Sequence, residues 1–296
     1  MVWEHHFKSV YCLSRPVKIN QNEIKFLSRQ DTTPNIWKES FLSLLRSYHI
    51  GLPEHVKRNR PYLKTLSSIS CLSDNEGSET DLILLHEGNH QLLEPITVRR
   101  RGTLIGCALG AIEDIPKRIK VKTQIPDNIN SSLSMITFDA ANLQIHNLTI
   151  ELSQLSESQV AEFDTERYFC LVQIAQAEPL FKNCVFSTSN APIGYCVHVW
   201  GERAEPHFVN CKIVNCGDNG LVFSDQSGGH VDSMEISNCR SPGLTCTTEA
   251  KPIFRQCKVH SNRDVGILLT GSCMPNFHNC KIFRNKSSGI EIQVKL

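Results

Sequence analysis

The chain has 296 residues, of which 31 are Lys or Arg and 30 are Asp or Glu, so its formal net charge is +1. Such a balanced charge excludes nucleic-acid binding by bulk electrostatic attraction. The first residues carry no apolar core of a signal peptide, and no apolar run reaches the length of a membrane span. We therefore expect a cytoplasmic or nuclear protein with neither nucleic acid nor a membrane as its partner.

The N-terminal region contains two stretches with helical periodicity. The first lies in residues 1–14, where three apolar side chains share one helix face: Trp3, Phe7 and Val10. The second is an apolar stripe over residues 36–48, and a proline just before it suits the start of a helix. The polar residues between the two stretches indicate an extended connection, so we assign residues 15–70 to a helical linker segment.

A polar stretch rich in Ser, Asp and Glu, residues 67–80, marks the boundary with a second region, which we assign to residues 78–296. This region contains only short alternating apolar runs and turn residues, a pattern typical of strands. Its first runs lie at residues 83–90, 95–98 and 104–106. The stretch from Glu151 to Arg167 is rich in Ser, Glu and Gln and is expected to form a loop.

The last third of the chain repeats with a period of 23 residues. Four glycines mark the period: Gly220, Gly243, Gly266 and Gly289. The phrase Pro-x-Phe-x-x-Cys-Lys-apolar precedes Gly220, Gly266 and Gly289, at residues 206–213, 252–259 and 275–282. A degenerate copy occupies residues 229–236, and a looser one occupies residues 179–186. A fixed period of this length indicates one structural unit stacked on itself.

We predict an all-β fold, a right-handed parallel β-helix of the pectin-lyase-like type, preceded by the short helical N-terminal segment. In this fold each coil contributes short strands that pair with the next coil about 4.8 Å away, so equivalent residues stack as rows. One predicted interior row contains Phe181, Phe208, Val231, Phe254 and Phe277, and the next contains Cys184, Cys211, Met234, Cys257 and Cys280. We expect each repeat glycine to adopt a backbone conformation at a corner that a side chain would obstruct.

The chain has 13 cysteines, and ten of them fall between Cys170 and Cys280. A zinc site or a disulfide framework would call for closely paired cysteines, but the chain contains no C-x-x-C pair. Four cysteines instead occupy one repeat position. We interpret them as small apolar side chains that fill the interior, and we expect no metal and no cofactor.

A β-helix can also carry a polysaccharide lyase or hydrolase, and such enzymes need clustered carboxylates. Residues 228–230 and 118–120 echo motifs of that class, but they occur in the wrong order and without a pair of aspartates. The aspartates of the repeats are single and lie mostly at turns: Asp218, Asp225, Asp232 and Asp264. We therefore predict that the chain is not an enzyme and has no catalytic residues.

Five histidines recur near strand positions: His198, His207, His230, His260 and His278. Their positions within the coils are expected to differ, which argues against a row of metal ligands and favours outward-facing side chains on a polar surface. The run Arg99 to Arg101 is the densest group of like charges and is expected to form a solvated turn between the first strands.

The tract from Pro34 to Phe41, the linker after it and the 23-residue coils resemble the β-helix-bearing F-box only proteins, numbers ten and eleven of that series. The phrases at residues 263–267 and 283–290 are similar to coil sequences of that family, and residues 2–11 resemble the last helix of its F-box. Two features depart from the family pattern. Nothing before Trp3 supplies the first F-box helices, and the chain lacks the further coils and the zinc-binding module of the family, which indicates a fragment or a shortened member.

The resemblance implies a substrate-recognition subunit of an SCF-type E3 ubiquitin ligase. The F-box would bind the Skp1–cullin complex, with Trp3, Phe7 and Val10 as contacts, and the β-helix would hold protein substrates for ubiquitination. One alternative is a β-helix scaffold that binds partners without a ligase, as in the similar SHC-binding spindle proteins. A second alternative is a polysaccharide lyase or hydrolase.

Overall fold

The computed structural model describes residues 48–51, 64–66, 81–99, 101–108, 111–125, 133–139, 143–153, 169–189 and 194–293, together with single positions at 54, 58, 68, 70, 72 and 191. The predicted helix of residues 1–14 lies outside these ranges. So does the predicted helical stripe of residues 36–48, except for its last residue. Tyr48 begins a strand rather than ending a helix, because its backbone pairs with strands on both sides.

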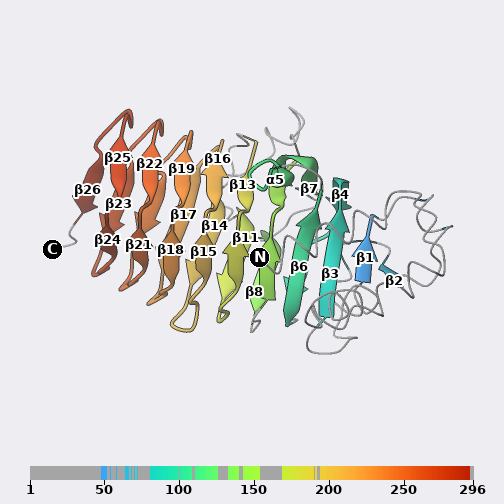
Figure 1. Cartoon of the computed structure of the whole chain (residues 1–296). Coiled ribbons are helices and arrows are strands. Elements are labelled where there is room, and N and C mark those ends of the chain that lie inside the picture. The colour runs from blue at the N-terminus through green and yellow to red at the C-terminus, as the bar shows by residue number, and fades with distance from the viewer. Residues whose placement is uncertain are drawn as a thin grey trace, which may run out of the picture.

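The described residues form a parallel β-helix with three sheets of ten, eight and eight strands. The three strands of one coil follow one another along the chain, and successive coils stack side by side from the teal end to the red end of Figure 1. All pairings are parallel. The predicted fold class is confirmed.

Sheet 1 contains ten strands: β1 (Tyr48–Ile50), β2 (Lys64–Leu66), β3 (Asp81–His86), β6 (Gly102–Cys107), β9 (Leu143–His146), β12 (Leu180–Lys182), β15 (His207–Val209), β18 (His230–Asp232), β21 (Ile253–Arg255) and β24 (Asn276–His278). β1 and β2 fall within the range for which the sequence predicts a helical linker, and they extend sheet 1 beyond β3. The domain boundaries stay predictions.

Sheet 2 contains eight strands: β4 (Gly88–Leu92), β7 (Ile119–Thr123), β10 (Thr149–Leu152), β13 (Val185–Ser187), β16 (Lys212–Val214), β19 (Glu235–Ser237), β22 (Lys258–His260) and β25 (Lys281–Phe283). A four-residue helix, α5 (Ile115–Arg118), precedes β7. The loop predicted from Glu151 starts later, because Glu151 pairs with Lys122 and Leu152 with Thr123 as part of β10.

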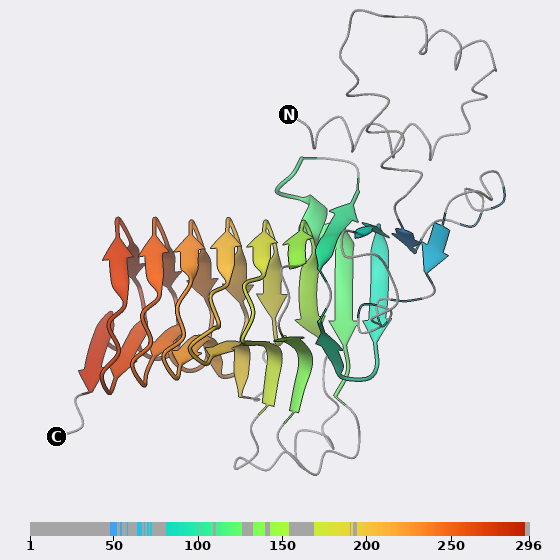
Figure 2. The same cartoon turned by 90° about the horizontal axis from the view of Figure 1, so that it is seen from below.

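Sheet 3 contains eight strands: β5 (Ile96–Val98), β8 (Leu133–Asp139), β11 (Phe169–Ala175), β14 (Tyr195–Trp200), β17 (Asn219–Ser224), β20 (Leu244–Cys246), β23 (Ile267–Thr270) and β26 (Ile290–Gln293). Figure 2 shows the same stack turned by 90°, with the strands of successive coils in parallel rows. None of the helices in the described ranges is long and apolar enough to cross a membrane.

The short strands of sheet 1 point their middle residue into the interior. Phe208 is buried between the half-buried His207 and Val209, as expected from the alternation of side chains along a strand. Phe208 pairs with Phe181 on one side and with Val231 on the other, and the two Phe rings stack with centroids 5.1 Å apart. The row continues through Phe254 and Phe277, whose rings also stack.

The corner between sheets 1 and 2 has a left-handed backbone. Its φ angles lie between 52° and 55° at one equivalent position of five coils: Asn183, Asn210, Ser233, Gln256 and Asn279. Asn tolerates this conformation better than most residues. The residue that follows each of them points inward and forms the second interior row, which contains Cys184, Cys211, Met234, Cys257 and Cys280.

The repeat glycines do not have the unusual backbone that we predicted for them. None of the four has a positive φ. Three of them, Gly220, Gly243 and Gly266, are required for a different reason, the close approach of the next coil. A Cβ at Gly220 would collide with the carbonyl oxygen of Gly243, and a Cβ at Gly266 would lie 2.6 Å from the carbonyl oxygen of Gly289.

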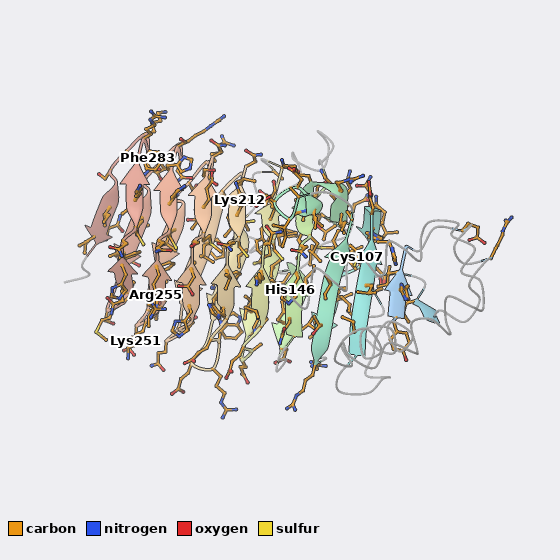
Figure 3. All side chains as sticks on the ribbon, in the orientation of Figure 1. Cys107, His146, Lys212, Lys251, Arg255 and Phe283 are labelled. Carbon is orange, nitrogen blue, oxygen red and sulfur yellow. The ribbon has the colours of Figure 1, made fainter. Side chains whose placement is uncertain are left out.

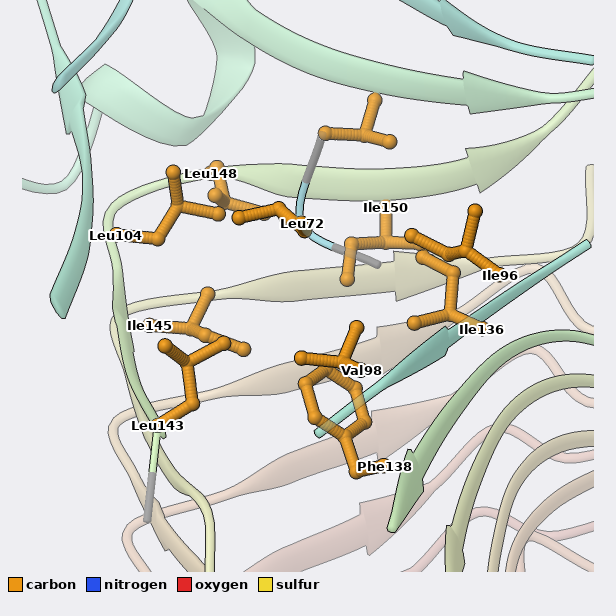
Figure 4. Close-up of a pocket in the computed structure, with 11 residues that line it drawn as sticks. Leu72, Ile96, Val98, Leu104, Ile136, Phe138, Leu143, Ile145, Leu148 and Ile150 are labelled. Carbon is orange, nitrogen blue, oxygen red and sulfur yellow. The ribbon is translucent and has the colours of Figure 1, made fainter. Parts of the chain in front are cut away.

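The interior of the first coils contains a cavity of about 20 Å³. Its lining is entirely apolar and includes Leu72, Ile96, Phe138 and Ile150, as Figure 4 shows. A water molecule needs polar partners, so an apolar space of this size stays dry. The cavity is a packing defect rather than a ligand site.

Candidate functional site

The structure places the repeat residues in the core, away from any surface where a partner could bind. The rows that begin at Phe181 and Cys184 both face the interior. Each row cysteine directs its thiol at a backbone carbonyl of the preceding coil, for example Cys211 at the oxygen of Phe181 (3.4 Å) and Cys257 at that of Val231 (3.2 Å). The tentative adaptor contacts Trp3, Phe7 and Val10 lie outside the described residues.

The described cysteines are free thiols, and all but two of them are buried. Burial raises the pKa of the Cys107 and Cys257 thiols to about 12 and raises that of Cys246 well above its usual range. A thiol held in this way stays protonated and unreactive. Within the described ranges no three His, Cys, Asp or Glu side chains are arranged to hold a metal ion.

Thiol labelling should separate the two kinds of cysteine. In the native protein we expect a maleimide reagent to modify Cys273 and Cys280 and to spare the other described cysteines, because only these two are partly exposed. Denaturation should make all of them reactive. Peptide mapping by mass spectrometry gives the result for each position, and rapid native labelling of Cys211 or Cys216 would contradict the buried arrangement.

The outer face of sheet 1 carries a connected group of charged side chains. His207 of β15 donates from Nε2 to Oδ2 of Asp232 in β18 at 2.8 Å. The guanidinium of Arg255 in β21 lies 3.7 Å from the other carboxylate oxygen and donates to Nδ1 of His230 at 3.3 Å. We call His207, His230, Asp232 and Arg255 the sheet 1 network.

The sheet 1 network corrects one prediction about the histidines. His207 and His230 occupy the same position in neighbouring coils, and their rings make an edge-to-face contact at 5.7 Å. The alignment of residues 229–236 with residues 206–213 already places His230 one period after His207. The prediction for the histidines overlooked this because Gly229 replaces the proline that precedes His207. Asp232 was grouped with turn residues, but it lies within β18.

The sheet 1 network presents hydrogen-bond donors around a single carboxylate. His278 extends it on the next strand, where it pairs with Arg255, and Lys182 lies two strands before Asp232 in the same row. Acid and base catalysis of glycoside cleavage needs two carboxylates. Asp232 is already bound to two partners, and the described strands place no second carboxylate in its row.

The outer face of sheet 3 has a serine, a histidine and an aspartate in contact. His198 Nε2 lies 2.9 Å from Ser224 Oγ, and that hydroxyl donates to Asp225 at 3.1 Å. The histidine must then donate its proton to the serine oxygen. A serine nucleophile needs the opposite polarity, with a base that accepts the hydroxyl proton. The group therefore fixes local structure, and half-exposed Trp200 beside Ser224 offers contact area.

Stability should fall in acid because of half-buried histidines such as His198. Burial lowers the pKa of His198 from 6.5 to about 4, although the charge of Asp225 acts in the opposite direction. As the pH falls, the imidazole of His198 binds a proton in the unfolded chain before it does so in the folded chain. The contribution of neutral His198 to the free energy of unfolding is therefore complete above about pH 6.5 and is lost as the pH falls toward 4. We expect His198→Gln to flatten the dependence of unfolding free energy on pH between 4 and 6.5. An unchanged slope would contradict this assignment.

The sequence echoes of sugar-cleaving motifs do not come together. His230 lies in sheet 1, whereas Arg118 ends α5 and Lys120 lies in β7 of sheet 2, several coils away. Arg118 binds Glu87 at 2.7 Å. Arg99, the first residue of the arginine run, lies between β5 and β6 and binds Asp139 at 3.2 Å.

Comparison with known proteins supports the fold and gives one functional lead. A model of the right-handed beta helix region matches residues 195–295. The F-box protein dre-1 of Caenorhabditis elegans is 26% identical over 245 residues, which cover 78% of this chain and 25% of that protein. The chain thus spans about a quarter of the length of this relative.

Two solved structures have a similar arrangement of strands. A pectin methylesterase from Aspergillus niger has a TM-score of 0.49 and 14% identity, covering 82% of this chain and 86% of its own. A pectin methylesterase in complex with a hexasaccharide has a TM-score of 0.42 and 12% identity, covering 77% and 80%. Identities this low carry no information about activity.

Proposed function

We propose that this chain is the substrate-recognition subunit of an SCF-type E3 ubiquitin ligase and that its β-helix binds the protein target. The similarity to an F-box protein over 78% of the chain is the observation that carries the proposal. In such a ligase the chain catalyses no reaction itself. It holds the target near the ubiquitin-loaded enzyme through the Skp1–cullin complex.

The geometry of the β-helix supports a role in protein binding. Equivalent residues repeat about every 4.8 Å along a rigid stack, so one face offers an extended surface of fixed shape. The interior rows occupy the inward positions and leave the outward ones free to vary. The sheet 1 network, which connects three neighbouring coils, is the surface that we assign to the target.

The proposal assigns Skp1 contact to the N-terminal residues Trp3, Phe7 and Val10. Purified chain should bind the purified Skp1–cullin complex in a pull-down, with a complete F-box protein as the positive control. We expect replacement of all three residues by alanine to reduce recovery at least tenfold, because aromatic anchors dominate interfaces of this kind. Trp200→Ala removes an equally large, half-exposed side chain from the β-helix and should leave recovery unchanged.

The outcomes separate the ligase from a scaffold without ligase activity. Recovery of the complex by the wild type and by Trp200→Ala, but not by the triple variant, supports the proposal. Absence of Skp1 from the wild-type pull-down, while the positive control recovers it, would overturn it and leave the scaffold function. Cleavage of polygalacturonate by the chain, with or without Ca²⁺, would overturn the non-catalytic assignment.

A further inference from the structure

The outer face of the last two described coils carries stacked basic side chains. Lys258 of β22 lies in register with Lys281 of β25. Arg263 and Lys286 follow in the turns between sheets 2 and 3, where their amides bond equivalent positions of the preceding coils. We define the basic patch as these four cations together with the two rings between them: Lys258, Lys281, Arg263, Lys286, His260 and Phe283.

An aromatic pair separates the two rows of cations in the basic patch. The rings of His260 and Phe283 stack with centroids 4.7 Å apart and an interplanar angle of 15°. Phe283 is 39% exposed, and the four cations are exposed as well. Figure 3 shows Phe283 on one edge of the stack and Lys251 of the same coils on the opposite edge.

Like charges face each other in the basic patch, unlike elsewhere in sheet 2. Lys212 faces Glu235 and binds it at 2.9 Å, and Glu151 binds Lys120 at 3.1 Å. Lys258 faces Lys281 on one side and Glu235 on the other, but the carboxylate of Glu235 is bound by Lys212 and His260. Within the described ranges none of the four cations of the patch forms an ion pair with a carboxylate. Like charges directly opposite in a sheet are destabilising. The pairing of Lys258 with Lys281 therefore does not serve the stability of the β-helix, and an anionic partner would relieve the repulsion.

The local excess of positive charge belongs to the last coils and not to the chain as a whole. Residues 251–293 contain seven Lys or Arg residues and two carboxylates, whereas the whole chain has a net charge of +1. On the side of the preceding coil the patch ends at Glu235. Lys212 and His260 bind that side chain, and the bond from Lys212 is the main reason that its pKa lies below the usual range.

We propose that the basic patch binds an extended acidic peptide segment of a partner protein, with an apolar residue of that segment on Phe283. The two cation rows suit carboxylates on either side of one apolar side chain, and the exposed ring supplies the contact between them. This site is separate from the sheet 1 network and from Skp1 binding.

Fluorescence anisotropy with the full chain tests the proposal. The probe is a labelled decapeptide of Glu and Asp with one central Leu. We expect Lys258→Glu combined with Lys281→Glu to weaken binding about tenfold, and we expect wild-type affinity to fall as salt rises. The matched control, Arg203→Glu with Lys251→Glu, makes the same charge change at turns between sheets 3 and 1 and should retain the affinity.

A second variant tests the role of the ring independently of charge. Phe283→Ala should weaken binding of the Leu-containing peptide and leave an all-acidic peptide unaffected, a difference that general loss of structure cannot produce. Equal affinity of the patch variant and the wild type would overturn the proposal, as would equal weakening by the control pair. A single-stranded RNA of the same length that binds more tightly than the peptide, and loses binding with the patch variant, would also overturn it.

Discussion

Replacement of Phe208 by alanine should lower the free energy of unfolding by about 3–5 kcal/mol. The Phe208 side chain is completely buried, stacks on Phe181 and makes an edge contact with Phe186 at 6.1 Å. Val231 on the other side cannot fill the space, because its position is fixed by pairing with two neighbouring strands. The substitution therefore leaves a cavity between coils, and its cost adds to the lost burial of the ring.

Urea unfolding followed by circular dichroism measures this loss. Phe283→Ala is the matched control, because the same side chain is removed from the outer face, where it is 39% exposed. We expect the control to change stability by less than about 1 kcal/mol. Equal losses in the two variants would show that the Phe208 row does not hold the coils together.

Replacement of Gly220 by alanine should lower stability by about 3 kcal/mol, although it adds a single methyl group. The new Cβ would collide with the backbone oxygen of Gly243 and would lie 2.9 Å from the sulfur of Cys239. A backbone oxygen that belongs to the next coil cannot move without breaking the ladder between Leu221 and Leu244. The strain therefore spreads to the pairing of β17 with β20.

Gly228→Ala provides the control for this second substitution. A Cβ at Gly228 would lie 3.6 Å from the side chain of Glu205, an ordinary contact, and its φ is not positive. In thermal unfolding, the midpoint temperature should decrease strongly for Gly220→Ala and change little for Gly228→Ala. A wild-type transition for Gly220→Ala would contradict the close approach of the coils.

The interior of this protein was predictable from the sequence, because a fixed period places identical residues at identical positions. The spacing of Phe254 and Phe277, or of Cys257 and Cys280, is the period itself, and the structure stacks these residues in register. The reason for the repeat glycines was not predictable. Periodicity shows that a position is constrained, but only the distance between coils shows that a carbonyl oxygen is the constraint.

The outer surface was much less predictable. The sheet 1 network joins His207 to Asp232 and Arg255 across coils whose outward residues have no repeated pattern. The repeat alignment, which places Gly229 at the position of the prolines in the other copies, fixes the register of the network but not its contacts. The stacked Lys258 and Lys281 lie one period apart, so the sequence did indicate that they face each other. It could not show that neither lysine forms an ion pair with a carboxylate. Strands β1 and β2 have no repeat signature, and only their pairing reveals them.

The difference between the inward and the outward positions of the coils connects the fold to the proposed function. Inward positions carry Phe, Cys and Gly because adjacent coils must fit closely. Outward positions differ from coil to coil and create two distinct surfaces, the sheet 1 network and the basic patch. A stack whose interior is fixed and whose faces vary is suited to recognising other proteins.

Recovery of the cullin with the tagged full chain from cells, with Skp1 present or depleted, tests the ligase assignment most directly. We predict that the cullin is recovered together with Skp1 and that depletion of Skp1 removes the cullin, while the folded state of the chain is unchanged. A precipitate that contains neither protein when Skp1 is present, or a cullin signal that persists after its depletion, would contradict the assignment.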